Sequence, residues 1–339
     1  MPTPQPGPVM LDIEGVSLTA LDQEKLAHPN TGGVILFTRN YEEPAQLAAL
    51  TQSIRQARRG PLLIAVDHEG GRVQRFHAGF TRLPPAAAYT EFPGLAESAG
   101  WLMAAELLAC GLDFSFAPVL DIDYGVSEII GDRAFAAGPE QTAALALAFM
   151  RGMRAAGMAS VGKHFPGHGG VGPDSHLTLP VDERSLNDIR AGDLIPFRRL
   201  IDAGLDAIMP AHVLYPQIDP LPAGFSSMWL QQILRRELEF QGAILSDDLN
   251  MAGADCAGDY PQRAELALQA GCDMILICNN PAAAEQILDR LPQIPSPERA
   301  ERLRRLGQRA PAISRAELHA SPEWRRIATS LANLSPAHA

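Results

Sequence analysis

The feature that most constrains the fold is an alternation of short apolar runs with longer helical patterns. Several runs are solidly apolar, which is typical of strands buried on both faces of a parallel sheet. Glycines follow several helical patterns directly, as expected where helices end. The runs that predict strands are Val9–Glu14, Gly33–Thr38, Leu62–Asp67, Phe114–Asp121, Ser160–His164, Ala207–Ala211, Ala243–Asp247 and Met274–Cys278.

Eight strands that alternate with helices predict an α/β fold, a (β/α)8 barrel. The alternative is a doubly wound open sheet, in which a glycine-rich phosphate-binding loop is expected after the first strand. Residues Leu11–Gly15 do not form such a loop, so the barrel is favoured. We expect residues 1–339 to form a single catalytic domain, with strands within about 9–280, C-terminal helices at about 281–330 and a frayed tail. The helical patterns are Ala45–Ala57, Leu95–Cys110, Pro139–Ala156, Asp188–Ala203, Ser227–Glu239, Gln262–Gln269 and Pro281–Leu291.

Composition narrows the class of protein. The hydrophobic content of 46% and charged content of 20% are ordinary for a soluble globular enzyme. A net charge of −11 argues against nucleic acid or an acidic membrane surface as a partner. The four cysteines form no CxxC pair, so we expect reduced thiols and a cytoplasmic location. Residues 1–8 lack a basic or apolar stretch, so we expect no signal peptide, and no apolar run is long enough to span a membrane.

Ionisable residues gather where the predicted strands end, and the active sites of barrel enzymes lie at that face. An inert barrel would need only turn-forming residues there, so this distribution predicts a polar active site. The roles of His212 and Asp248 within it stay open. The residues concerned are Asp67 at the end of the third run with Arg72 and Arg75 after it, Asp121 at the end of the fourth with Asp123 and Arg133 after it, Lys163 and His164 in the fifth, His212 after the sixth, and Asp247 and Asp248 at the seventh.

A long loop follows the fifth predicted strand and carries several ionisable side chains. Pro166 and the neighbouring glycines prevent a helix from forming there. Long loops inside compact domains are usually functional or disordered. Asp174 and His176 are two residues apart, so in an extended loop they lie on the same side. The carboxylate can then orient the imidazole, which is suited to giving and taking a proton.

A carboxylate that attacks and a group that transfers a proton suit glycoside hydrolysis with retention. Asp247, at a strand end, lies on a rigid element, as a nucleophile requires. Asp248 follows directly, and strand alternation points it the other way, so we expect only one of the two to face the site. Arg75, Arg133 and Lys163 would bind hydroxyl, amide or carboxylate groups of a substrate.

Five motifs together resemble the family 3 glycoside hydrolases, most closely the single-domain bacterial β-N-acetylglucosaminidases of peptidoglycan recycling. The resemblance covers roughly Met10 to Asn280, with the motifs in the same order. The motifs are Asp67–Phe76, Ile129–Phe135, Lys163–Gly169, Asp174–His176 and Ser246–Met251.

The resemblance implies a (β/α)8 barrel and a retaining, double-displacement mechanism without metal or cofactor. It implies that Asp247 is the nucleophile and that Asp174 and His176 form an acid/base dyad on a mobile loop. The implied substrates are muropeptides or disaccharides that contain N-acetylglucosamine, in cell-wall recycling linked to cell shape and division. No nucleic acid, membrane or protein partner is implied. The implied ligands of the N-acetylglucosamine are Asp67, Arg75, Arg133, Lys163 and His164.

Three alternatives remain open. A metal-dependent hydrolase could use His164, His168 and His176, although Pro166 breaks the helix that would align a zinc-binding pair. A carbohydrate-binding protein on an inactive barrel would be expected to lack one of the three implied catalytic residues. An N-acetylglucosaminide phosphorylase could use the same site, because a histidine in place of a carboxylate repels phosphate less.

Overall fold

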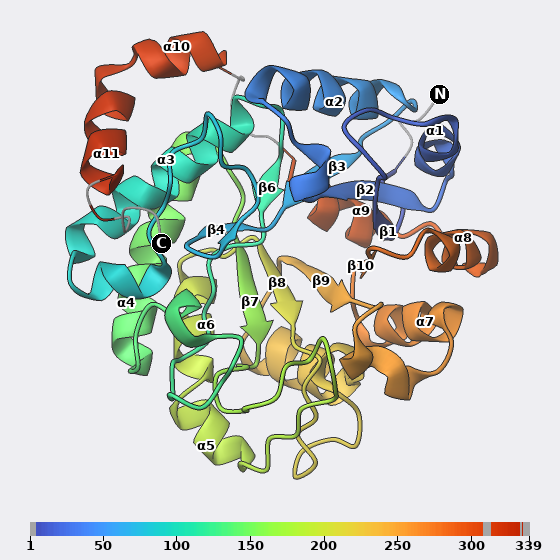
Figure 1. Ribbon diagram of the computed structural model, residues 1–339. Coiled ribbons are helices and arrows are strands. Elements are labelled where there is room, and N and C mark those ends of the chain that lie inside the picture. Colours follow the sequence, from blue (N-terminus) through green and yellow to red (C-terminus); the bar gives the residue numbers. More distant parts are fainter. Residues whose placement is uncertain (1–4, 308–312, 333, 335–339) are drawn as a thin grey trace.

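The computed structural model describes residues 5–307, 313–332 and 334. Eight parallel strands form the inner sheet in the order β6-β3-β2-β1-β10-β9-β8-β7, and helices surround it (Figure 1). The predicted (β/α)8 barrel is confirmed. The strands are β1 (Val9–Asp12), β2 (Thr31–Leu36), β3 (Leu63–Val66), β6 (Phe114–Ser115), β7 (Val161–Phe165), β8 (Ala207–Pro210), β9 (Ala243–Asp248) and β10 (Met274–Ile277).

The helices that cover the barrel begin and end close to the predicted positions in most cases. They bury their apolar faces against the strands, in one continuous hydrophobic core. The helices are α1 (Ala20–Ala27), α2 (Pro44–Gln56), α3 (Ala96–Leu108), α4 (Pro139–Ala156), α5 (Leu186–Ala191), α6 (Leu194–Asp202), a π-helix (Met228–Glu237), α7 (Tyr260–Ala270), α8 (Pro281–Arg290), α9 (Pro297–Arg304), α10 (Arg315–Ala320) and α11 (Pro322–Ala332).

The barrel closes between β6 and β7 through a few backbone hydrogen bonds. The Val161 N–H donates to the Ala117 carbonyl at 2.7 Å, and the Leu120 N–H donates to the Lys163 carbonyl at 2.6 Å. Regular strand structure ends at Ser115, so the prediction of a strand over Phe114–Asp121 is wrong in length. Pro118 lacks an N–H group and interrupts the ladder.

Two further differences from the predicted elements have local causes. The predicted helix Asp188–Ala203 is two helices, α5 and α6, because Gly192 adopts a non-helical backbone and Asp193 is held by Arg184. Helix α1 was not predicted, although Thr19 starts it with a capping box. Neither difference changes the order of the barrel strands.

A short hairpin and the C-terminal helices complete the fold. Strands β4 (His68–Gly70) and β5 (Val73–Gln74) pair antiparallel beside the end of β3. Helix α11 lies against α3, where the Trp324 indole N–H donates to the Glu106 carboxylate at 2.9 Å. The predicted frayed tail falls mainly on residues 333 and 335–339, outside the described residues. Among the helices that the structure describes, none is long and apolar enough to cross a membrane.

Candidate active site

A cavity of about 570 Å³ lies where the barrel strands end. Apolar side chains from β2, β8 and β10 contribute to its lining, and most of its polar residues lie within or just after β3, β7 and β9. The cavity brings together all eight of the residues to which the family resemblance gives a catalytic or sugar-binding role. They are Asp67, Arg75, Arg133, Lys163, His164, Asp174, His176 and Asp247.

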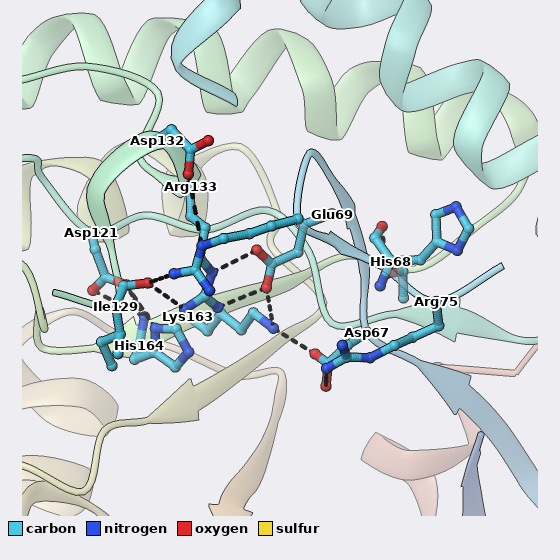
Figure 2. Close-up of polar contacts among 12 residues, drawn as sticks. Asp67, His68, Glu69, Arg75, Asp121, Ile129, Asp132, Arg133, Lys163 and His164 are labelled. Atoms are coloured by element: carbon cyan, nitrogen blue, oxygen red, sulfur yellow. Dashed lines mark hydrogen bonds and ion pairs between the residues drawn. The ribbon is translucent and has the colours of Figure 1, made fainter. Parts of the chain in front are cut away.

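One side of the cavity carries a network of alternating charges, drawn in Figure 2. The Lys163 ammonium contacts Asp67 Oδ1 and Glu69 Oε1, both at 2.7 Å. Arg133 donates to both oxygens of Glu69, from Nε at 2.9 Å and from Nη2 at 2.8 Å. Arg75 Nη2 lies 3.9 Å from Asp67 Oδ2. These ion pairs fix the side chains of Lys163 and Arg133 at the cavity wall and link the end of β3 to β7.

Burial and ion pairing act in opposite directions on this network. Burial alone would raise the pKa of the Glu69 carboxyl, but Arg133 and Lys163 outweigh it and hold that pKa well below its usual range. Burial alone would lower the pKa of Lys163, but Asp67 and Glu69 raise it. Glu69 and both cations therefore stay charged at neutral pH.

His164 is oriented by a buried carboxylate. Asp121, which is fully buried, lies with Oδ2 2.6 Å from His164 Nδ1. Asp121 also accepts the backbone N–H groups of His164 and His168. Burial would raise the pKa of Asp121, but the two histidines lower it, so the carboxylate is ionised. An ionised carboxylate accepts a hydrogen bond from the Nδ1–H group and leaves Nε2 of His164 for other partners.

Asp247 and Asp248 end β9, and both line the cavity. The Asp248 carboxylate accepts the N–H groups of Asn250 and Cys278, both at 3.0 Å, and the expectation that only one of the two carboxylates faces the site stays a prediction. Burial raises the pKa of Asp248 to about 7. Burial alone would raise the pKa of Asp247 as well. Three groups outweigh burial and lower this pKa below its usual value: the rings of His212 and His164, and the backbone N–H of Asp248. Asp247 is thus the carboxylate that is fully ionised at neutral pH.

Asp174 and His176 contact each other directly at the cavity mouth. Asp174 Oδ1 lies 2.7 Å from His176 Nδ1 and accepts the His176 backbone N–H at 2.8 Å. The contact was predicted, but from an extended loop. The segment is a turn instead, in which the N–H groups of Leu177 and Thr178 donate to the Asp174 carbonyl. Burial would raise the pKa of Asp174, and the two hydrogen bonds from His176 lower it.

Several residues of the site were missed by sequence reasoning. Glu69 lies two residues from Asp67, and this spacing was the available signal that both carboxylates reach the same cations. His212, whose role was left open, is buried, and its Nε2 donates to the Asp248 carbonyl at 3.1 Å. Asp121 was noted only as a residue at a strand end.

The three histidines considered as zinc ligands are engaged separately. His164 contacts Asp121, His176 contacts Asp174, and Nε2 of His168 lies 3.0 Å from the hydroxyl of Ser175. Across residues 5–307, 313–332 and 334, no group of three or more histidine, cysteine and carboxylate side chains is arranged to hold a metal ion. The metal-dependent alternative therefore gains no support from the geometry.

Comparison with known proteins identifies the family. Residues 10–307 match the model of the glycosyl hydrolase family 3 N-terminal domain. The β-hexosaminidase of Thioalkalivibrio sulfidiphilus is 57% identical over 94% of each chain, and that of Methylococcus capsulatus is 58% identical over 93% of this chain and 96% of the relative. The structure also resembles the crystal structure of NagZ from Neisseria gonorrhoeae in complex with N-trifluoroacetyl-D-glucosamine. The two sequences are 43% identical, and the structures superpose with a TM-score of 0.93 over 99% of this chain and 100% of that chain. The chain therefore belongs to glycosyl hydrolase family 3, and within that family it is one of the β-N-acetylhexosaminidases.

Proposed function

We propose that this β-N-acetylhexosaminidase removes terminal N-acetylglucosamine from peptidoglycan-derived muropeptides and disaccharides in the cytoplasm, as a step of cell-wall recycling. Asp247 attacks the anomeric carbon while His176, oriented by Asp174, gives its proton to the leaving oxygen. A water molecule then attacks the anomeric carbon of the glycosyl-Asp247 ester and displaces the Asp247 carboxylate, while His176 takes a proton from the water. Two inversions give overall retention.

The observation that carries this proposal is the pairing of His176 with Asp174 at the mouth of the cavity that contains Asp247. A nucleophilic carboxylate must be ionised, and the lowered pKa of Asp247 meets that requirement. An acid/base group must exchange a proton near neutral pH, which is within the range of an imidazole beside a carboxylate. The two roles therefore fall on groups with suitable chemistry on one cavity.

The charged network supports the recognition of a sugar. Asp67, Arg75, Arg133, Lys163 and His164 present both donors and acceptors to the cavity, as the hydroxyl groups of a pyranose require. Ion pairs already hold Lys163 and Arg133 in place, so little side-chain freedom is lost on binding. The related NagZ of Neisseria gonorrhoeae was crystallised with an N-acylated glucosamine, which supports this sugar as the ligand of the donor subsite.

The nucleophile can be tested with two neighbouring substitutions. Asp247→Asn keeps the shape of the side chain and removes its charge, so kcat should fall by several orders of magnitude, about 1.4 kcal/mol of barrier for each tenfold loss. The matched control is Asp248→Asn, which keeps the oxygen that accepts the two backbone N–H groups. It should lose far less activity on an aryl N-acetyl-β-glucosaminide. Equal losses in the two variants would refute the assignment of Asp247.

The acid/base role can be tested by varying the leaving group. In His176→Ala, kcat/KM for 2,4-dinitrophenyl N-acetyl-β-glucosaminide should change little, because this phenolate leaves without protonation. N,N′-Diacetylchitobiose, whose leaving group is an alkoxide, should lose about several hundredfold. Equal losses on both substrates would transfer the role to another residue. Product analysis in phosphate buffer distinguishes hydrolysis from phosphorolysis, and a parallel assay with a chelator tests the metal-dependent alternative.

A further inference from the structure

The serine between the two residues of the dyad has no part in the chemistry proposed above. Ser175 is only 1% exposed, whereas the side chain of the next residue, His176, is 63% exposed. A loop residue is buried to this degree only where the loop packs against the rest of the protein. Ser175 is therefore the point at which the dyad segment is attached to the barrel.

Two hydrogen bonds make this attachment. The Ser175 hydroxyl lies 3.0 Å from Nε2 of His168, and both groups are buried. The Ser175 carbonyl accepts the backbone N–H of Gly253, also at 3.0 Å. Gly253 lies in the segment that follows β9, and β9 carries Asp247. Ser175 thus joins the loop that follows β7 to the segment that follows the strand of the proposed nucleophile.

The partner of the serine hydroxyl is itself firmly placed. The backbone N–H of His168 donates to Asp121 Oδ1 at 2.7 Å, and the same carboxylate contacts the His164 ring. Among the described residues, Nδ1 of His168 has no hydrogen-bond partner. The ring of His168 is therefore held by a hydrogen bond only at Nε2, by the Ser175 hydroxyl. The chain of contacts from Asp121 through His168 to Ser175 ties the dyad to the proposed sugar site.

Gly253, whose N–H group donates to the Ser175 carbonyl, has no room around it for a side chain. A Cβ atom at position 253 would lie 2.9 Å from Cβ of His212 and 3.2 Å from the Ser175 carbonyl oxygen. Contacts this short require the surrounding atoms to move. Glycine at this position therefore lets the segment after β9 approach the dyad loop closely enough to hydrogen-bond it.

We propose that Ser175 is a positioning residue, whose two hydrogen bonds hold Asp174 and His176 over the cavity that contains Asp247. This inference rests on the proposed acid/base role of His176. Loss of one hydrogen bond from a buried partner changes a conformational equilibrium by about tenfold. Removing the hydroxyl should therefore lower the ratio of molecules with the dyad in place to molecules with the dyad displaced by about that factor, and should slow only the steps that use the dyad.

The test compares Ser175→Ala with Thr178→Ala, a control on the same loop whose side chain is exposed. For Ser175→Ala, kcat/KM on N,N′-diacetylchitobiose should fall by more than about twofold and by up to about tenfold, while kcat/KM on 2,4-dinitrophenyl N-acetyl-β-glucosaminide and the Ki of N-acetylglucosamine stay within about twofold of the parent. Thr178→Ala should match the parent on both substrates. Equal losses of Ser175→Ala on both substrates would show a purely structural role and overturn the proposal.

A double-mutant cycle separates this inference from the proposed function. In a His176→Ala background, Ser175→Ala should cause no further loss on the disaccharide, because the group that it positions is absent. If His176→Ala shows the expected leaving-group dependence but Ser175→Ala behaves as the parent, only the positioning role fails. If His176→Ala loses equally on both substrates, the acid/base role fails as well. His168→Gln, which can still hydrogen-bond the serine, should retain more disaccharide activity than His168→Leu, and the reverse order would also overturn the proposal.

Discussion

Replacing Glu69 by glutamine removes the negative charge that Arg133 and Lys163 share. The carboxylate is 7% exposed and receives three charged hydrogen bonds, two from Arg133 and one from Lys163. Removing one partner of a buried ion pair costs about 3–5 kcal/mol of stability, because the remaining charge is left without a counter-charge. Asp67 remains beside Lys163, so Arg133 bears most of the loss.

The stability lost in Glu69→Gln is measurable by thermal unfolding. With an unfolding entropy of about 2.1 cal/mol/K per residue, a chain of 339 residues shifts its Tm by about 1.4 °C per kcal/mol, so Glu69→Gln should lower Tm by about 4–7 °C. Glu140→Gln is the matched control. It breaks a 2.7 Å contact with Arg199 whose two side chains are 65% and 60% exposed, and it should shift Tm by about 1 °C or less. Equal shifts in the two variants would refute the argument from burial.

The pH dependence gives a second check on the same variant. The pKa of Glu69 is held below its ordinary value near 4.5, so its contribution is complete above that pH and declines as the pH falls toward the lowered pKa. The difference in Tm between parent and Glu69→Gln should therefore be constant from pH 7 to pH 5 and should narrow below pH 4.5. KM for an aryl N-acetylglucosaminide should rise more than kcat falls, because the two cations lose their fixed positions. A difference in Tm that widens in acid would contradict the assigned charge.

Two further predictions follow from the site. The kcat/KM for aryl N-acetyl-β-glucosaminides should exceed that for aryl β-glucosides by at least about a hundredfold, because a site that hydrogen-bonds the acetamido group of the proposed substrate would be left with unpaired polar groups on a glucoside. Comparable values would contradict the proposed substrate. Burial raises the pKa of Asp248 from 3.8 to about 7, so the folded protein keeps a proton that the unfolded chain releases, and Asp248 reduces stability progressively as pH rises from about 4 to 7. The Tm of Asp248→Asn relative to the parent should rise through that window and level off above it, and a difference that does not depend on pH would exclude the raised pKa.

The barrel could be predicted from the sequence because its strands are buried on both faces. Runs such as Leu63–Val66 and Met274–Ile277 are apolar throughout, and each is followed by a glycine-punctuated or polar segment. The length of β6 could not be predicted, because the apolar run continues past Pro118, whereas regular pairing stops at Ser115 and resumes only as an isolated bridge between Val119 and Lys163. Regular burial is visible in a sequence, whereas the pairing of backbone groups across strands is not.

The sequence predicted which residues line the candidate site but not which partners hold them in place. Strand ends and spacing indicated the side chains that line the cavity, including the contact between Asp174 and His176. The charge partners were missed, since the pairing of Glu69 with Lys163 joins segments about ninety residues apart and depends on the angle at which each enters the cavity. The same holds for Ser175, whose partners lie on two different loops.

The pairing of the first strand with the last has a consequence for the synthesis of this protein. In the finished barrel β1 lies between β2 and β10, with Val9 opposite Ile275. Until the ribosome has added residue 277, one edge of β1 has no strand to pair with, and at about 5–20 residues per second this interval lasts roughly 13–53 s. An apolar strand with an open edge is a site of aggregation. We therefore expect the nascent chain to be most prone to aggregate at this edge of β1 until the last strand is complete.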